Sequence, residues 1–97
     1  MITAIVLLHV EVDAIPETAQ AVADVDRVSE VYSVTGDWEL VALVRVRRHE
    51  DIAEVVTGRI AKVPGVTGTH TMVAFQAFSS SDLERLWGIG FDEGEGV

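Results

Sequence analysis

The sequence contains no cysteine, only two prolines and few aromatic residues. Without cysteine, the chain has no disulfides, thiolate catalysis or cysteine-ligated zinc. Basic residues are also scarce, at 7 against 16 acidic residues, for a formal net charge of −9. This balance argues against nonspecific binding to nucleic acid, whose phosphate backbone favours clustered Lys and Arg. With 97 residues, the chain is one small domain that depends on its core or on oligomerisation for stability.

No targeting or membrane-spanning segment is recognisable in the sequence. Residues 1–10 are apolar, but no basic stretch precedes them, and Glu11 and Asp13 follow. The stretch is also too short to span a bilayer. We therefore interpret it as a strand and expect a cytoplasmic protein.

The spacing of apolar residues predicts the order strand, helix, strand, strand, helix, strand. The expected elements cover residues 2–12, 13–25, 28–35, 38–47, 49–62 and 66–78. Asp13 and Asp51 are the expected helix caps, and Gly36 lies in the turn of a hairpin. An ungapped shift that aligns Ala4 with Ala42 also aligns the rest of two β-α-β halves. This predicts an α+β, ferredoxin-like β-α-β-β-α-β sandwich, with the first and third strands central in an antiparallel sheet.

We expect the sandwich to occupy residues 1–78, and residues 79–97 to add a short helix and an acidic, glycine-rich tail. Ser81 and Glu84 form a possible capping box. Trp87 and Phe91 are large apolar groups with little core of their own, so we expect them to dock on the body or on a neighbouring subunit.

Both faces of the predicted sheet are apolar. The residues expected to face the helices are Ala4, Val6, Leu8, Ala42, Val44 and Val46. Those expected on the other face are Ile5, Leu7, Val41, Leu43, Val73 and Phe75. Leaving the second group in water would forfeit roughly 1.5–3 kcal/mol for each side chain. We therefore expect a face-to-face dimer, with a folded-back C-terminal tail as the alternative cover.

Motifs for metal binding, nucleophilic catalysis and phosphate binding are missing from the sequence. His9, His49 and His70 have no ligand spacing, although His9 and His70 lie on strands expected to be neighbours. The serines at 79–81 lack the pattern of a nucleophile elbow. The arginines near the end of the third strand suggest an anion site or, more simply, surface ion pairs. We expect no metal and no cofactor.

The hairpin loop at residues 34–40 is the most informative stretch. It combines the backbone N–H groups of a glycine turn with two carboxylates, an indole and a hydroxyl. Backbone donors suit a ligand carboxylate, and a side-chain carboxylate suits an ammonium group, so the loop could hold an α-amino acid. The alternative is an ordinary hairpin turn.

Residues 2–78, which include this loop, resemble the effector-binding RAM domain of the Lrp/AsnC (leucine-responsive and asparagine-type) transcriptional regulators. The resemblance is carried by the opening strand, by residues 28–40, and by residues 63–66 with the Thr69-His70-Thr71 ending. In the family pattern, Thr/Ser-Gly is followed by two variable residues, an acid and an aliphatic residue. Here the acid is Glu39, where the family more often has Asp.

The resemblance implies sheet-to-sheet dimers, rings such as octamers or decamers, and amino-acid effectors bound between dimers. It assigns the effector carboxylate to Gly36 and its neighbours, and the ammonium to Glu39. Thr69 and Thr71 are weaker candidates. The implied effector-binding residues are Val34, Thr35, Gly36, Asp37, Trp38, Glu39, Leu40, Thr69 and Thr71.

Full-length regulators of this family carry an N-terminal helix-turn-helix domain, whereas here the first strand starts at Ile2. We therefore expect a stand-alone sensing module without catalysis, which co-assembles with a full-length regulator or modulates an enzyme and binds neither DNA nor membrane. One alternative is a small cofactor-free enzyme of the dimeric α+β barrel monooxygenase type, with His9, His70, Tyr32 or Trp38 in an internal pocket. Another is a structural module that binds nothing.

Overall fold

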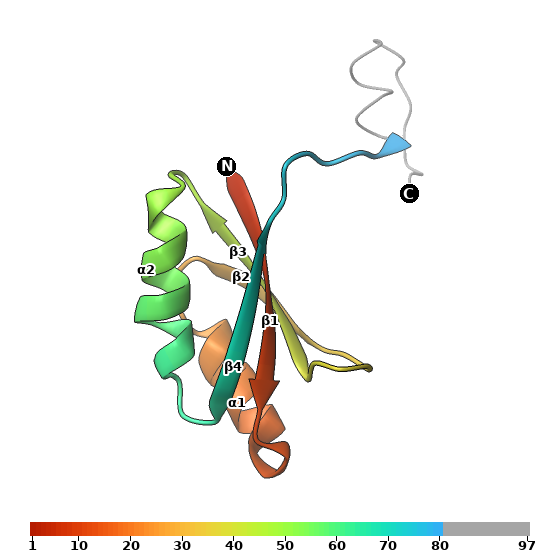
Figure 1. Ribbon diagram of the computed structural model, residues 1–97, viewed down its shortest axis with the longest axis vertical. Coiled ribbons are helices and arrows are strands. Elements are labelled where there is room, and N and C mark those ends of the chain that lie inside the picture. The colour runs from red at the N-terminus through yellow and green to blue at the C-terminus, as the bar shows by residue number, and fades with distance from the viewer. Residues whose placement is uncertain (81–97) are drawn as a thin grey trace.

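A computed structural model describes residues 1–80, in which one antiparallel sheet is covered on one side by helices (Figure 1). The strands are β1 (Ile2–Val10), β2 (Val28–Ser33), β3 (Leu40–Val46) and β4 (Val66–Val73), in the sheet order β2-β3-β1-β4. Helix α1 (Ile15–Ala23) follows the 3-10 turn η1 (Val12–Ala14), and helix α2 (Glu50–Gly58) precedes the 3-10 turn η2 (Ile60–Lys62). The predicted ferredoxin-like order and the central position of the first and third strands are confirmed.

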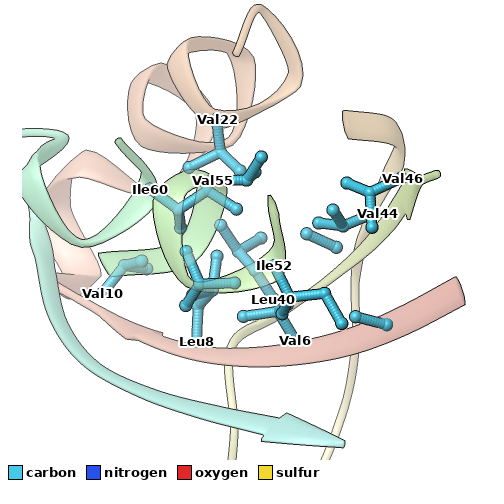
Figure 2. Close-up of a cluster of buried hydrophobic side chains, with 13 residues drawn as sticks. Val6, Leu8, Val10, Val22, Leu40, Val44, Val46, Ile52, Val55 and Ile60 are labelled. Atoms are coloured by element: carbon cyan, nitrogen blue, oxygen red, sulfur yellow. The ribbon is translucent and has the colours of Figure 1, made fainter. Parts of the chain in front are cut away.

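The core lies between the sheet and the two helices. Side chains alternate along a strand, and every second residue of β1 and β3 is buried on the helix side. Val22, Val55 and Ile60 approach these strand residues from α1, α2 and η2 (Figure 2). All six residues expected to face the helices are buried: Ala4, Val6, Leu8, Ala42, Val44 and Val46.

The register of the central strands explains this shared burial. Ala4 lies opposite Val44, and Leu8 lies opposite Leu40. Directly opposed residues of an antiparallel pair project from the same face of the sheet. The two halves of the sequence repeat therefore supply matching strands to one apolar layer.

Both predicted helix caps are wrong. A 3-10 turn containing Asp13 precedes α1, so Ala14 occupies the N-cap position, without a side-chain hydrogen bond. His49 is the N-cap residue of α2, and Asp51 lies in the first turn, where its carboxylate accepts a hydrogen bond from Arg48 Nη2 at 3.2 Å. The sequence also places Pro16 at the start of the first helix. In the structure, Pro16 lies in the first turn of α1, where a missing N–H is tolerated.

The last strand is shorter than predicted, and its two faces differ from the expectation. β4 ends at Val73, and Phe75 lies beyond the sheet with its side chain in solvent. Val73 pairs with Ala4, which places it on the helix side, whereas Met72 pairs with Ile5 on the other side. The sequence alone could not fix this register, because β4 is a polar edge strand with little alternation. The expected capping box at Ser81 and the docking of Trp87 fall outside the described residues.

A tight turn joins η2 to β4 and contacts α1. Gly65 has a φ of +100°, and a Cβ on this residue would collide with the buried side chain of Thr18. Thr18 Oγ1 donates a hydrogen bond to the Pro64 carbonyl at 3.2 Å. The Gly65 carbonyl in turn accepts the N–H of Glu11 at 2.9 Å. This turn therefore ties the end of β1, helix α1 and the start of β4 together.

Candidate functional site

The sheet face opposite the helices, here called the open face, is apolar along the middle of its two central strands. Cross-strand pairing assigns to it the apolar and aromatic residues Ile5, Leu7, His9, Tyr32, Val41, Leu43, His70 and Met72, together with the polar residues Thr3, Glu30 and Arg45. The aliphatic residues of the central strands are half-buried there, and Tyr32 and Met72 are 50% and 41% exposed. The expectation of a second apolar face is confirmed for the central strands, with Met72 in place of Val73.

The hairpin loop at residues 34–40 lies at one end of this sheet. The Val34 N–H donates to the Glu39 carbonyl at 3.1 Å, which closes the hairpin below the loop. Gly36 has a φ of +111°, a conformation that favours glycine. Within residues 1–80, the N–H groups of Thr35, Gly36 and Asp37 donate to no acceptor. The loop therefore offers three backbone donors beyond the end of the sheet.

Glu39 is tied to the neighbouring strand by its side chain. Its Oε1 accepts the backbone N–H of Val10 at 2.9 Å and lies 3.2 Å from Nδ1 of His9. The Val10 N–H, and after it His9, lower the pKa of the Glu39 carboxyl below its ordinary value of 4.5. Glu39 is therefore ionised at neutral pH and has a fixed orientation, with its Oε2 accepting no hydrogen bond within residues 1–80.

Trp38 is held against the histidines of the open face. Its indole stacks on the His9 ring with centroids 3.9 Å apart and planes inclined by 14°. Its centroid lies 6.0 Å from that of His70, at a tilt of 38°. The sequence had suggested that His9 and His70 approach each other, and in the structure both contact the same indole. This cluster connects the loop to the open face.

The predicted site residues fall into three groups. Residues 34–37 are exposed in the loop, and Trp38 and Glu39 are partly buried where the loop meets β1. Leu40 is buried in the core, so its side chain is inaccessible. Thr69 and Thr71 pair with Leu8 and Val6 on the helix-side face of β4. The structure therefore brings residues 34–39 together, and it does not bring the two threonines to this loop within one chain.

His9 is a site residue that the sequence reasoning did not connect with Glu39. The two residues are 30 positions apart, so no local motif joins them. The expected pairing of the first and third strands carried the necessary signal, because the ladder from Ile2–Val46 to Leu8–Leu40, continued by one residue, sets His9 beside Glu39.

A charged cleft lies on the helix side of the molecule, apart from the loop and the open face. It has a volume of about 220 Å³ and is lined by Asp26, Arg27, Asp51, Glu54, Val55 and Arg59. Arg59 pairs with Glu54 at 3.5 Å, and Arg27 lies 3.9 Å from Asp26. Of the arginines near the end of β3, Arg48 pairs with Asp51 at 3.2 Å, which favours the surface ion-pair interpretation for that residue. Nothing in the sequence indicated the cleft, because its walls meet only in the folded chain.

The rival enzyme interpretation required polar groups in an internal pocket. The buried residues among 1–80 are aliphatic apart from Thr18, whereas His9, Tyr32 and His70 lie on the open face, with Trp38 stacked there. No group of three or more metal-ligating side chains occurs within residues 1–80. In the same part of the chain, no helix is long and apolar enough to cross a membrane.

Comparison with known protein families gives a match over most of the chain. Residues 3–83 match the family model described as the Lrp/AsnC ligand binding domain. The chain belongs to the Lrp/AsnC ligand-binding domain family. The resemblance in residues 2–78 is thereby confirmed, and the enzyme alternative gains no support.

Relatives of this Lrp/AsnC domain include named regulators. The HTH-type transcriptional regulator FL11 of Pyrococcus horikoshii is 33% identical over 73 residues, which cover 75% of this chain and 48% of FL11. The chain thus spans about half the length of the curated relatives it matches. Among solved structures, TTHA0845 from Thermus thermophilus is 44% identical with a TM-score of 0.76, over 80% of this chain and 98% of that one.

A more distant structure shares the fold alone. The transcriptional regulator NMB0573 from Neisseria meningitidis, solved as a complex with L-Met, is 14% identical with a TM-score of 0.72. The match covers 80% of this chain and 52% of NMB0573. The ferredoxin-like architecture is therefore that of Lrp/AsnC ligand-binding domains.

Proposed function

We propose that the loop at residues 34–40 binds a small α-amino acid and that the chain is a non-catalytic, regulatory sensing module. The observation that carries the proposal is the fixed carboxylate of Glu39 beside the free donors of the loop. An ammonium group pairs with an ionised carboxylate, and backbone N–H groups of a glycine turn suit a ligand carboxylate. A free amino acid carries both groups on one carbon atom.

The family supports this choice of ligand. The matching family model is a ligand-binding domain, and the structure of NMB0573 is a complex with L-Met. In this chain, the N–H groups of Thr35 and Gly36 would hold the carboxylate, and Glu39 Oε2 would hold the ammonium. Leu40 contributes through its backbone, because its side chain is buried.

We further propose that the open face is covered by a second copy of the chain, and that dimers assemble into a ring such as an octamer or decamer. Two sheets packed face to face bury such surfaces about 10 Å apart. Half-buried Leu7 and Leu43 lie at the middle of this face. Thr69 and Thr71 would reach an effector only from another subunit, which agrees with a site between dimers.

The named relatives are transcriptional regulators, so we propose that this module acts on transcription by co-assembling with a full-length regulator in the cytoplasm. Its own net charge of −9 gives it little affinity for the DNA backbone. Pull-down of a tagged full-length Lrp/AsnC regulator from the same organism would test co-assembly. Failure to recover any such regulator would leave a purely homo-oligomeric module.

Calorimetry with each of the twenty amino acids tests the binding site. We expect at least one to bind at sub-millimolar concentration. Glu39→Gln should weaken that binding about tenfold or more, because the charge-assisted contact is lost. Asp37→Asn is the comparison within the same loop, since Asp37 is exposed there, and it should weaken binding less than Glu39→Gln does. Absence of binding at millimolar levels would overturn the proposal.

Light scattering tests the assembly. The wild-type chain should have at least twice the monomer mass at micromolar concentration, and Leu43→Arg should yield monomers by placing a charge in the open face. Val12→Arg is the control, because Val12 is 80% exposed in η1, outside that face. A monomeric wild-type chain would refute the proposed assembly.

A further inference from the structure

The stretch that follows β4 is apolar and leaves the body of the molecule. The last backbone hydrogen bond to the sheet runs from the Ala74 N–H to the Thr3 carbonyl at 2.9 Å. Beyond it, the chain runs away from the sheet (Figure 1). Phe75 and Phe78 are 102% and 83% exposed. Residues 74–78 are called the arm below.

This exposure contrasts with the composition of the core. The chain has three phenylalanines, yet every buried apolar side chain within residues 1–80 is aliphatic. Two of the largest apolar side chains are thus in water while smaller ones fill the interior. Isolated exposed apolar residues are ordinary, but two phenylalanines on one short segment form a contact surface of the kind enriched at protein interfaces.

The arm is poorly placed to cover the open face of its own chain. It extends β4, which is an edge strand of the sheet, and it starts beside Thr3 at the end of the sheet opposite the 34–40 loop. To reach Leu7 or Leu43 of the same chain, it would have to reverse direction at Ala74, whereas it continues outward (Figure 1).

The arm is long enough to reach the sheet of a second copy of the chain. A second sheet stacked on the open face would lie about 10 Å away. An extended chain advances about 3.3 Å per residue, so the four steps from Ala74 to Phe78 span roughly 13 Å. The arm can therefore cross from its own sheet to the sheet of a second copy.

We propose that the arm crosses to a second copy of this chain and that Phe75 and Phe78 pack against that copy. This inference rests on the face-to-face dimer proposed above and adds a reciprocal contact to it. By two-fold symmetry each copy gives one arm and receives one. Four phenyl groups then add to the contact between the two sheet faces.

Thiol labelling tests the position of the arm, because the natural chain has no cysteine. Phe75→Cys should react with a maleimide about tenfold or more slowly in the dimer than in a monomer produced by adding Leu43→Arg. Val12→Cys, which is exposed outside the open face, should react equally fast in both states. Slow labelling of Phe75→Cys in the monomer as well would mean that its own chain covers the arm, and would overturn the proposal.

The dissociation constant of the dimer gives an independent measurement. The double variant Phe75→Ala/Phe78→Ala should raise it at least about thirtyfold, as expected for buried aromatic contacts. Gln76→Ala in the same arm should change it less than about twofold. Far-ultraviolet circular dichroism should show both variants folded, because these side chains lie outside the core.

The possible outcomes separate the two proposals. A wild-type chain that is monomeric refutes both the dimer and the arm contact. A wild-type dimer whose dissociation constant is unchanged in Phe75→Ala/Phe78→Ala refutes the arm contact and leaves the sheet-to-sheet dimer intact. A thirtyfold weakening together with protection of Phe75→Cys supports the arm contact.

Discussion

Trp38 lies flat on His9, with their ring centroids 3.9 Å apart. Stacked aromatic rings shield each other's faces from water. We therefore predict that replacing the His9 ring changes the fluorescence of Trp38. The measurement needs Trp87→Phe, because the chain has two tryptophans.

Two histidine variants test this contact at one fixed pH. His9→Gln should change the emission of Trp38 clearly, because His9 stacks directly on the indole. His70→Gln should change it less, because the His70 centroid is 6.0 Å away and its ring is tilted. If His70→Gln had the larger effect, the stacked arrangement of Trp38 on His9 would be contradicted.

The Glu39 carboxylate predicts a pH dependence of stability. Its pKa in the folded chain is lowered, first by the Val10 N–H and then by His9. A lowered pKa stabilises the fold fully above the ordinary value of 4.5, and this stabilisation is lost as the pH falls through the lower folded value. Glu39→Gln should therefore be less stable than wild type at pH 7, and the difference should shrink towards pH 3.

Urea denaturation at several pH values measures this effect. Asp37→Asn serves as the control, because Asp37 is exposed in the same loop, and its difference from wild type should be small throughout. A constant gap between Glu39→Gln and wild type from pH 7 to pH 3 would mean that the carboxylate charge contributes nothing through these hydrogen bonds.

Gly65 should tolerate no side chain. Its φ is +100°, and an added Cβ would collide with Thr18. Gly65→Ala combines backbone strain with a steric clash against the buried Thr18 side chain, so we predict a loss of about 2–4 kcal/mol in the free energy of unfolding. Thermal or urea unfolding measures it.

Substitutions at two other glycines distinguish the backbone strain from the steric clash. Gly36 has a φ of +111° with nothing within 4 Å of an added Cβ, so Gly36→Ala should cost only the backbone strain, roughly 1–2 kcal/mol. Gly58 lies at the end of α2, where a Cβ would make one ordinary contact with Glu54 at 3.9 Å. Gly58→Ala should stabilise the chain by about 0.5–1 kcal/mol. Equal costs at positions 36 and 65 would exclude the clash.

The parts of this fold that follow local periodicity were predictable from sequence. The two-residue period of side chains along β1 and β3 separated the core residues from those of the open face, although both faces are apolar. Val73 was assigned to the wrong face, because its side depends on the pairing with Ala4, a long-range register. The predicted caps failed for a similar reason, since a 3-10 turn before α1 moved the helix start past Asp13.

The candidate site was predictable only in part. The loop at residues 34–40 was found from its composition, a glycine turn with two carboxylates and an indole, together with the family resemblance that it carries. The contacts of Trp38 and Glu39 with His9 required the folded sheet, because they join residues about thirty positions apart. The binding roles of Thr69 and Thr71 stay predictions, since they depend on another subunit.

Arg27 has a positive φ of 79°, an uncommon conformation for a residue with a side chain. Its carbonyl accepts the N–H of Arg45 at 3.0 Å, next to the irregular pairing between Val28 and Glu30. This pairing holds the backbone in place despite the strain. We predict that Arg27→Gly stabilises the chain by about 0.5–1 kcal/mol, because glycine adopts this conformation without steric cost.

Arg27→Ala distinguishes backbone strain from charge. Alanine keeps the strain and removes the guanidinium, whose exposed pair with Asp26 at 3.9 Å contributes little. Urea denaturation should therefore show Arg27→Ala close to wild type and Arg27→Gly above both. An equal gain in the two variants would show that loss of the arginine side chain, and not relief of the positive φ, stabilises the chain. Because only glycine relieves the φ, the difference between the variants measures the strain stored at this position.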